Sequence, residues 1–184
     1  LPDGARDPDF GRHRVVIEGV SPEIDGGRYP IKRTVGQTVC VEADIFADGH
    51  DRLACRLLHR REVDDAWSAV AMTPLVNDRW RAEFAVAELV PYRYTLEAWV
   101  DHFVTWRQAL SKRVDAGQNV QVELAIGAEL LEAAADRAEG ADAAQLASWA
   151  RKLRGPEAPG QIELALSRPL ADLMALYPDR RFRT

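Results

Sequence analysis

The segment ADIFADGHD, residues 43–51, carries three carboxylates and one imidazole that could together bind a divalent cation. The side chains are those of Asp44, Asp48, His50 and Asp51. Their spacing does not match a calcium-binding EF-hand loop, which needs oxygen ligands at positions 1, 3, 5, 7, 9 and 12. A polar hairpin loop built on Asp48-Gly49 is the simpler interpretation. We therefore predict no metal site.

Other arrangements of residues that perform catalysis are missing from the sequence. The histidines His13, His50, His59 and His102 lie on separate segments, and none has the spacing of metal ligands. There is no G-x-S-x-G elbow, no Walker loop and no Rossmann glycine pattern. A glycosidase-type carboxylate pair needs only closeness in space, so the sequence leaves it open, but no two acidic residues stand out. We predict no catalytic residue and no cofactor.

Tryptophan is the remaining residue type that could bind a ligand, because an exposed indole can stack on a sugar ring. Trp67, Trp80, Trp99 and Trp106 fall in segments that favour β-strand. Rings in such positions usually fill the interior of a sandwich. Trp99 differs, because strand alternation places it on the polar face of its segment. We therefore take Trp99 as the candidate substrate-binding or interface ring.

Composition and charge restrict the class of protein. The 184 residues are 47% hydrophobic and 29% charged, which is typical of a globular chain. The net charge of −5 argues against nucleic acid and anionic membrane surfaces as partners. No apolar run is long enough to span a membrane, and LPDGARDPDF lacks the apolar core of a secretion signal.

The two cysteines are too few for a disulfide scaffold. A hairpin closing near Gly49 would place Cys40 opposite His59 and out of register with Cys55. We therefore expect two reduced thiols and a cytoplasmic location.

The first two thirds of the chain are rich in aromatic and β-branched residues, which suit a sheet. Short alternating segments are separated by turn signals such as Asp25-Gly26-Gly27 and Asn77-Asp78. They predict about seven antiparallel strands in an immunoglobulin- or fibronectin-like β-sandwich. The expected strands are Arg14–Glu18, Thr38–Phe46, Leu53–Arg60, Trp67–Met72, 80–84, Tyr92–Val100 and Phe103–Arg107.

The last third of the chain favours helices. Eleven alanines, the best helix-forming residue, fall between Ala125 and Ala150. Apolar stripes predict an αα-hairpin made of helices over 120–139 and 142–153, followed by helical pieces after Gly160. Such a hairpin must bury its stripe on the sandwich, on another helix or on another subunit. Already between 106 and 114, an apolar residue at every fourth position indicates a helical turn.

We therefore predict a β-sandwich domain over residues 12–117 and a helical segment over residues 118–184. Residues 1–11 are expected to be flexible. The fold class is mainly β with an appended α part.

Five separated blocks of the sequence resemble, in the same order, the amino-terminal region of bacterial α-1,4-glucan:maltose-1-phosphate maltosyltransferases of the α-amylase clan. The resemblance covers nearly the whole chain, from about Arg14 to Phe182, and it is more specific than a short motif. The blocks are RVVIEGVSPEIDGGRYPIKRTVGQTVCVEADIFADGHDRLACRLLHR, PLVNDRWRAEF, YRYTLEAWVDHFVTWR, KRVDAGQNV and LYPDRRF.

The resemblance implies a parent enzyme that extends a linear α-1,4-glucan by two glucose units, using maltose 1-phosphate as the donor. Its aspartate nucleophile and glutamate acid/base would lie in a (β/α)8 barrel that begins after Thr184. No position of this chain matches those catalytic residues. The resemblance also implies that the helical segment forms a homodimer and that the sandwich lies near the barrel. The loop Asp48–Asp51 and Trp99 are the residues we expect at that contact.

Two functions from different classes follow. The first is a non-catalytic region that serves dimer assembly and supports the downstream barrel. The second is an independent carbohydrate-binding sandwich that holds α-glucan on its aromatic rings. Glucan affinity without a barrel, lost on Trp99→Ala, would favour the second.

Overall fold

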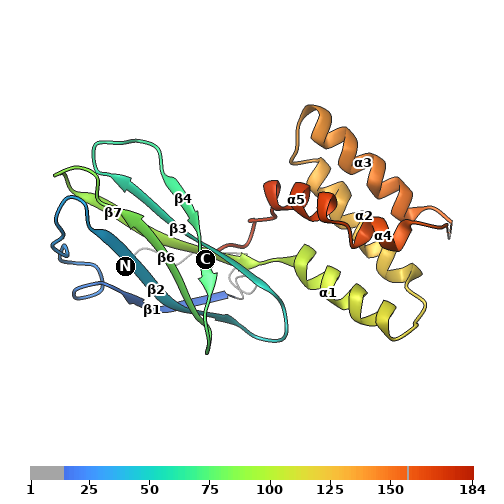
Figure 1. Cartoon of the computed structure of the whole chain (residues 1–184), viewed down its shortest axis with the longest axis horizontal. Helices are drawn as coiled ribbons and strands as arrows, with labels where there is room; N and C mark the ends of the chain where they lie inside the picture. The colour runs from blue at the N-terminus through green and yellow to red at the C-terminus, as the bar shows by residue number, and fades with distance from the viewer. Residues whose placement is uncertain (1–14, 157) are drawn as a thin grey trace, which may run out of the picture. The chain divides into compact units, whose positions relative to one another are not determined.

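A computed structural model describes residues 15–184 except residue 157. Contacts divide these residues into a β unit, formed by 15–100 with 181–184, and a helical unit, formed by 101–180 (Figure 1). The fold class, mainly β with an appended helical part, is confirmed. The division falls after Val100, whereas the sequence placed it at residue 117. The segment 1–11, predicted to be flexible, lies outside the described residues.

The β unit consists of two antiparallel sheets, with strand orders β1-β2-β6-β5 and β4-β3-β7. The strands are β1 (Val15–Ser21), β2 (Thr38–Ala47), β3 (Leu53–Arg61), β4 (Ser68–Ala71), β5 (Thr73–Pro74), β6 (Arg79–Ala85) and β7 (Tyr92–Val100).

Alternating side chains of both sheets form one core, as expected for a sandwich. The predicted inward face of β2 is confirmed, since Val41, Ala43 and Ile45 are buried. They belong to the same cluster as Leu57 of β3 and Ala98 of β7. The alternation of apolar and polar residues therefore identified the buried faces of the central strands.

The predicted hairpin of residues 38–60 is wrong, because β2 and β3 belong to different sheets. Cys40 lies opposite Glu83, and Cys55 lies opposite Ala98. A chain that crosses between sheets lets both strands bury their apolar faces in the shared interior. Both cysteines are free, and burial raises the pKa of Cys55 to about 12.

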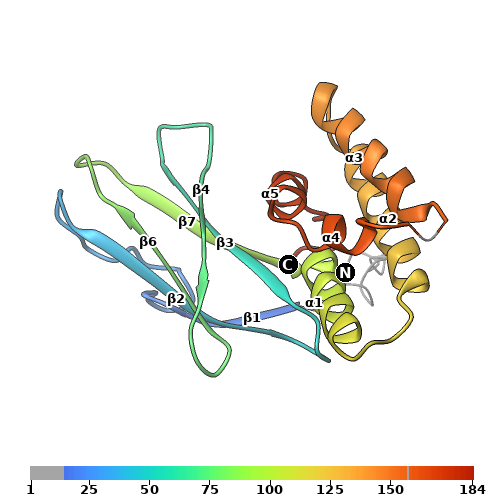
Figure 2. The ribbon, with the colours of Figure 1, turned by 45° about the vertical axis from the view of Figure 1, so that its right-hand side comes forward.

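Among the described residues, the helical unit forms five helices. Figure 2 shows them from a second direction. They are α1 (His102–Asp115), α2 (Gln121–Ala135), α3 (Gly140–Arg154), α4 (Gln161–Ala165) and α5 (Arg168–Leu176).

Helix α1 replaces the strand that the sequence predicted over Phe103–Arg107. The Asp101 carboxylate accepts a hydrogen bond from the backbone N–H of Val104 at 2.9 Å, which is a helix N-cap. The period of four is confirmed, since Trp106 and Leu110 are buried in the helical core. The short aromatic run at 103–107 has high β-propensity, but the cap and the longer apolar period favour the helix.

The αα-hairpin is confirmed as α2 and α3, which pack on each other. Leu131 of α2 and Leu146 of α3 are fully buried in a core that α1, α4 and α5 also enter. The apolar stripes are therefore covered within the helical unit itself. The prediction that the stretch after Gly160 forms separate helical pieces is also confirmed, since α4 and α5 are distinct helices. The Ser167 hydroxyl caps α5 by accepting a hydrogen bond from the N–H of Leu170 at 3.3 Å.

After α5 the chain returns to the β unit. Ala98 and Thr184 exchange two backbone hydrogen bonds, of 3.1 and 2.9 Å, which is the pattern of an antiparallel pair. The Thr184 hydroxyl also donates to the carbonyl of Val15 at 2.8 Å. These bonds fasten the last residues to both β7 and β1.

Candidate functional site

Trp99, the candidate substrate-binding or interface ring, is only 7% exposed. The preceding residue, Ala98, is also buried, so β7 is covered on both faces at this end. Alternation identifies an exposed face only where a strand has one face in solvent, and that condition fails here. Trp99 therefore cannot offer a ring face to a ligand.

The acidic segment 43–51 does not form a metal site. Asp44 accepts a hydrogen bond from the Arg79 guanidinium at 3.1 Å. Arg79 also bonds the Glu42 carboxylate at 3.2 Å and the Gly19 carbonyl at 3.1 Å, joining three strands. Within residues 15–184, leaving out 157, no group of three potential ligands could hold a metal ion.

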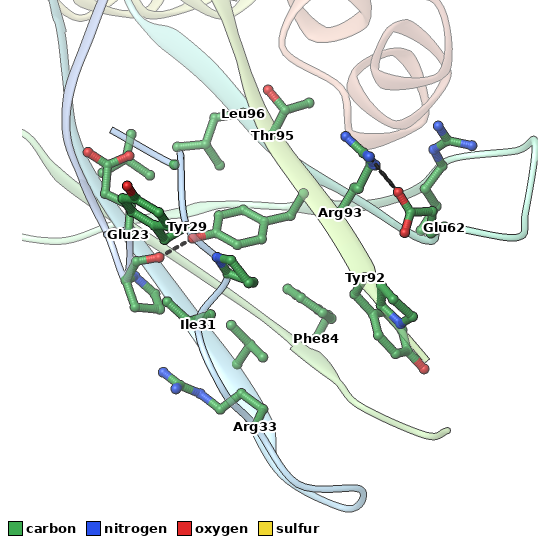
Figure 3. A pocket seen from close by; sticks show the side chains of 18 of the residues that line it. Glu23, Tyr29, Ile31, Arg33, Glu62, Phe84, Tyr92, Arg93, Thr95 and Leu96 are labelled. Carbon is green, nitrogen blue, oxygen red and sulfur yellow. Dashed lines mark hydrogen bonds and ion pairs between the residues drawn. The ribbon is translucent and has the colours of Figure 1, made fainter. Parts of the chain in front are cut away.

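A groove of about 1080 Å³ opens on the β unit (Figure 3). It is lined by the β1–β2 connection, by β7, and by residues at the ends of β3 and β6. Two exposed rings line it, Tyr29 at 56% and Trp67 at 42% exposure. In Figure 3, Phe84 lies between Tyr29 and Tyr92, but it is only 5% exposed and supports the floor of the groove.

The rings of the groove are held by specific contacts. The Tyr94 hydroxyl donates to the carbonyl of Pro22, which ties β7 to the β1–β2 connection. The Tyr92 hydroxyl accepts from the backbone N–H groups of Ala87 and Glu88, both at 3.2 Å. These contacts fix the shape of the groove.

The two exposed rings have their own supports. The N–H of Tyr29 donates to the carbonyl of Ile24 at 3.3 Å, closing a turn in which residues 25–27 all have positive φ. The Arg60 guanidinium lies 5.0 Å from the centre of the Trp67 ring, which is a cation–π contact. One face of Trp67 is thus engaged by the protein.

Two of the arginines that line the groove are paired with carboxylates. Arg93 donates to Glu62 at 3.0 Å, and Arg28 donates to Asp25 at 3.3 Å. Burial and the nearby Glu23 carboxylate raise the pKa of Tyr94. Its hydroxyl therefore stays protonated and remains a donor at neutral pH.

Lowering the pH is expected to destabilise the β unit through His59. The imidazole stacks on Phe84 with ring centres 4.5 Å apart, and burial lowers its pKa below 6.5. The unfolded chain then binds the proton more readily, so the free energy of unfolding falls as pH drops below 6.5. Urea unfolding at about pH 7.5 and about pH 5 measures this change. An equal pH dependence in His59→Leu would contradict the assignment to His59.

Sequence reasoning missed the groove and placed Trp67 on a strand. Trp67 instead lies just before β4, in the connection from β3. The Asp25-Gly26-Gly27 turn was the available signal, because it presents Tyr29 on a connection rather than on a sheet face. Nothing local in the sequence indicated that these two connections line one groove.

These features define a β-sandwich unit joined to a five-helix unit, with a ring-lined groove on the former. The sequence matches, over residues 13–184, the family described as α-1,4-glucan:maltose-1-phosphate maltosyltransferase, domain N/S. The chain belongs to this family. No helix within the described part of the chain has the length and apolar character to cross a membrane.

Relatives that carry the same enzyme name are considerably longer. The maltosyltransferase of Chlorobaculum tepidum is 47% identical over 96% of this chain and 26% of its own length. The maltosyltransferase of Myxococcus xanthus is 45% identical over 90% of this chain and 26% of its own length. That of Cereibacter sphaeroides is 43% identical over 79% of this chain and 26% of its own length. The chain thus spans about a quarter of the length of these relatives. The expected resemblance is confirmed.

Proposed function

We propose that this chain serves as a non-catalytic region of a maltosyltransferase that elongates α-1,4-glucan from maltose 1-phosphate. The observation that carries this proposal is a family match across residues 13–184 that spans only 26% of the relatives. The chemistry of the described residues agrees with it. In segment 43–51 the Asp44 carboxylate is bonded to Arg79. Burial raises the pKa of Cys55 to about 12, which keeps this cysteine a neutral thiol.

The proposal includes assembly of a homodimer through the helical unit and support of a downstream catalytic barrel. The apolar stripes that the sequence suggested as a dimer surface are buried within the helical unit. Val122 and Ile126 of α2 are exposed and lie four residues apart, on one helix face. This smaller apolar face supports the dimer proposal. The free thiols of Cys40 and Cys55 support a cytoplasmic location.

Phosphate release from maltose 1-phosphate, with maltohexaose as acceptor, tests the proposal. This chain is compared with the same gene product extended through the expected barrel. We expect release from the extended protein and none above background from the 184-residue chain, because the catalytic carboxylates would lie in the barrel.

Two results would contradict the proposal. Phosphate release by the 184-residue chain would place catalysis within it. Absence of release from a folded extended protein would separate this fold from the reaction. For the assembly part, light scattering should give twice the monomer mass for the chain, and Val122→Glu with Ile126→Glu should restore the monomer. Exposed Val76→Glu in the β unit is the matched control.

A further inference from the structure

We infer that the groove of the β unit binds a linear α-1,4-glucan; the identity of this ligand rests on the function proposed above. Tyr29 and Trp67 are the two rings that we assign to sugar contact. They come from different connections, β1–β2 and β3–β4, yet line the same groove.

The size and surface of the groove suit an oligosaccharide. Its volume of about 1080 Å³ lies just above the usual range for small-molecule sites, about 300–1,000 Å³. Sugar rings present flat C–H faces that pack on aromatic rings and hydroxyl edges that need polar partners. The groove offers both, because the exposed rings of Tyr29 and Trp67 and the Arg93–Glu62 pair all line it (Figure 3).

The charge arrangement favours a neutral sugar over a phosphorylated one. Arg93 is bonded to Glu62, and the Arg60 guanidinium lies over Trp67. The remaining charges beside Tyr94 are of opposite sign, Glu23 and Arg33, since both act on its hydroxyl. A phosphate site would instead gather several cations without matching anions. Four arginines and two glutamates line the groove, and Arg28 is bonded to Asp25. Because two of the arginines have carboxylate partners, we assign the groove to glucan rather than to maltose 1-phosphate.

The exposed rings are held in place before any ligand arrives. Trp67 is stacked by Arg60, and Tyr29 follows a closed turn. Binding therefore orders few side chains, which lowers its entropic cost. A preformed aromatic groove distinguishes this site from an apolar patch that becomes ordered only on assembly.

Titration calorimetry of the 184-residue chain with maltoheptaose tests the inference. Tyr29→Ala and Trp67→Ala should each weaken binding about tenfold, because each removes a ring face from the sugar. Tyr29→Phe keeps the ring and should stay within about twofold of the unchanged chain. Val76→Ala, at an exposed apolar residue outside the groove, is the matched control. Cellopentaose, with the same sugar but β-1,4 links, should bind more weakly than maltoheptaose.

Four other results would each contradict the groove assignment or the proposed function. Maltoheptaose binding that both alanine variants retain would move the site away from this groove. Tighter binding of maltose 1-phosphate than of maltoheptaose would overturn the choice of a neutral ligand. If maltoheptaose does not bind but the extended protein releases phosphate, the glucan-binding role of the groove is wrong and the proposed function stands. Ring-dependent binding without phosphate release by the extended protein would overturn the proposed function and leave a glucan-binding module.

Discussion

Replacing Leu57 with alanine is expected to lower the free energy of unfolding of the β unit by about 3 kcal/mol. Leu57 is fully buried and lies in the centre of β3, the middle strand of its sheet. Val70 on β4 and Leu96 on β7 lie directly opposite it. Because ladders on both sides hold this backbone, the core cannot easily collapse into the cavity that the truncation leaves.

Urea unfolding followed by tryptophan fluorescence measures the loss. Leu89→Ala is the matched control, because the same atoms are removed from a side chain that is 88% exposed. That variant should change the free energy of unfolding by no more than about 0.5 kcal/mol. Equal losses from the two variants would mean that Leu57 is not in a rigid core.

Replacing Gly127 with alanine is expected to destabilise the helical unit by about 2 kcal/mol. In most helix interiors this change stabilises, because alanine is the better helix former. Here a Cβ on Gly127 would overlap the Trp106 ring and lie 2.7 Å from two further ring atoms. The indole cannot readily withdraw, because its N–H donates to the Glu123 carbonyl at 2.7 Å and its ring packs on Phe103.

The loss should depend on the indole, which a double-mutant cycle tests. Gly127→Ala should cost much less in a Trp106→Phe background, since the smaller ring leaves room for the added methyl group. Thermal unfolding followed by circular dichroism at the helical band gives all four stabilities. An unchanged cost in that background would show that the contact with Trp106 does not explain the glycine.

Local patterns in the sequence predicted single strands and helices better than they predicted which strands pair with each other. The alternation of residues 39–45 identified the buried face of β2, and the Ser167-Arg168-Pro169 sequence identified the start of α5. Both signals depend on neighbouring residues alone. The pairing of Cys40 with Glu83 depends on which sheet receives the chain after residue 47, and no local pattern contains that choice.

The candidate site was less predictable than the fold for a related reason. Trp99 was chosen because one strand face was assumed to lie in solvent, but β7 is buried on both faces there. Tyr29 and Trp67 belong to connections whose meeting depends on the packing of two sheets. The close contact between Gly127 and Trp106 is likewise a property of packing, because the two residues lie on different helices.

The antiparallel pair formed by Ala98 and Thr184 means that residues of the β unit lie on both sides of the helical unit in the sequence. The chain leaves the β unit after Val100, re-enters it at Arg181, and pairs with Ala98 of β7 at Thr184. The backbone hydrogen bonds between Ala98 and Thr184 therefore close a loop of chain that contains residues 101–180. The entropy of closing such a loop grows only with the logarithm of its length. A sandwich built in this way can therefore accept helical insertions of different lengths at small energetic cost.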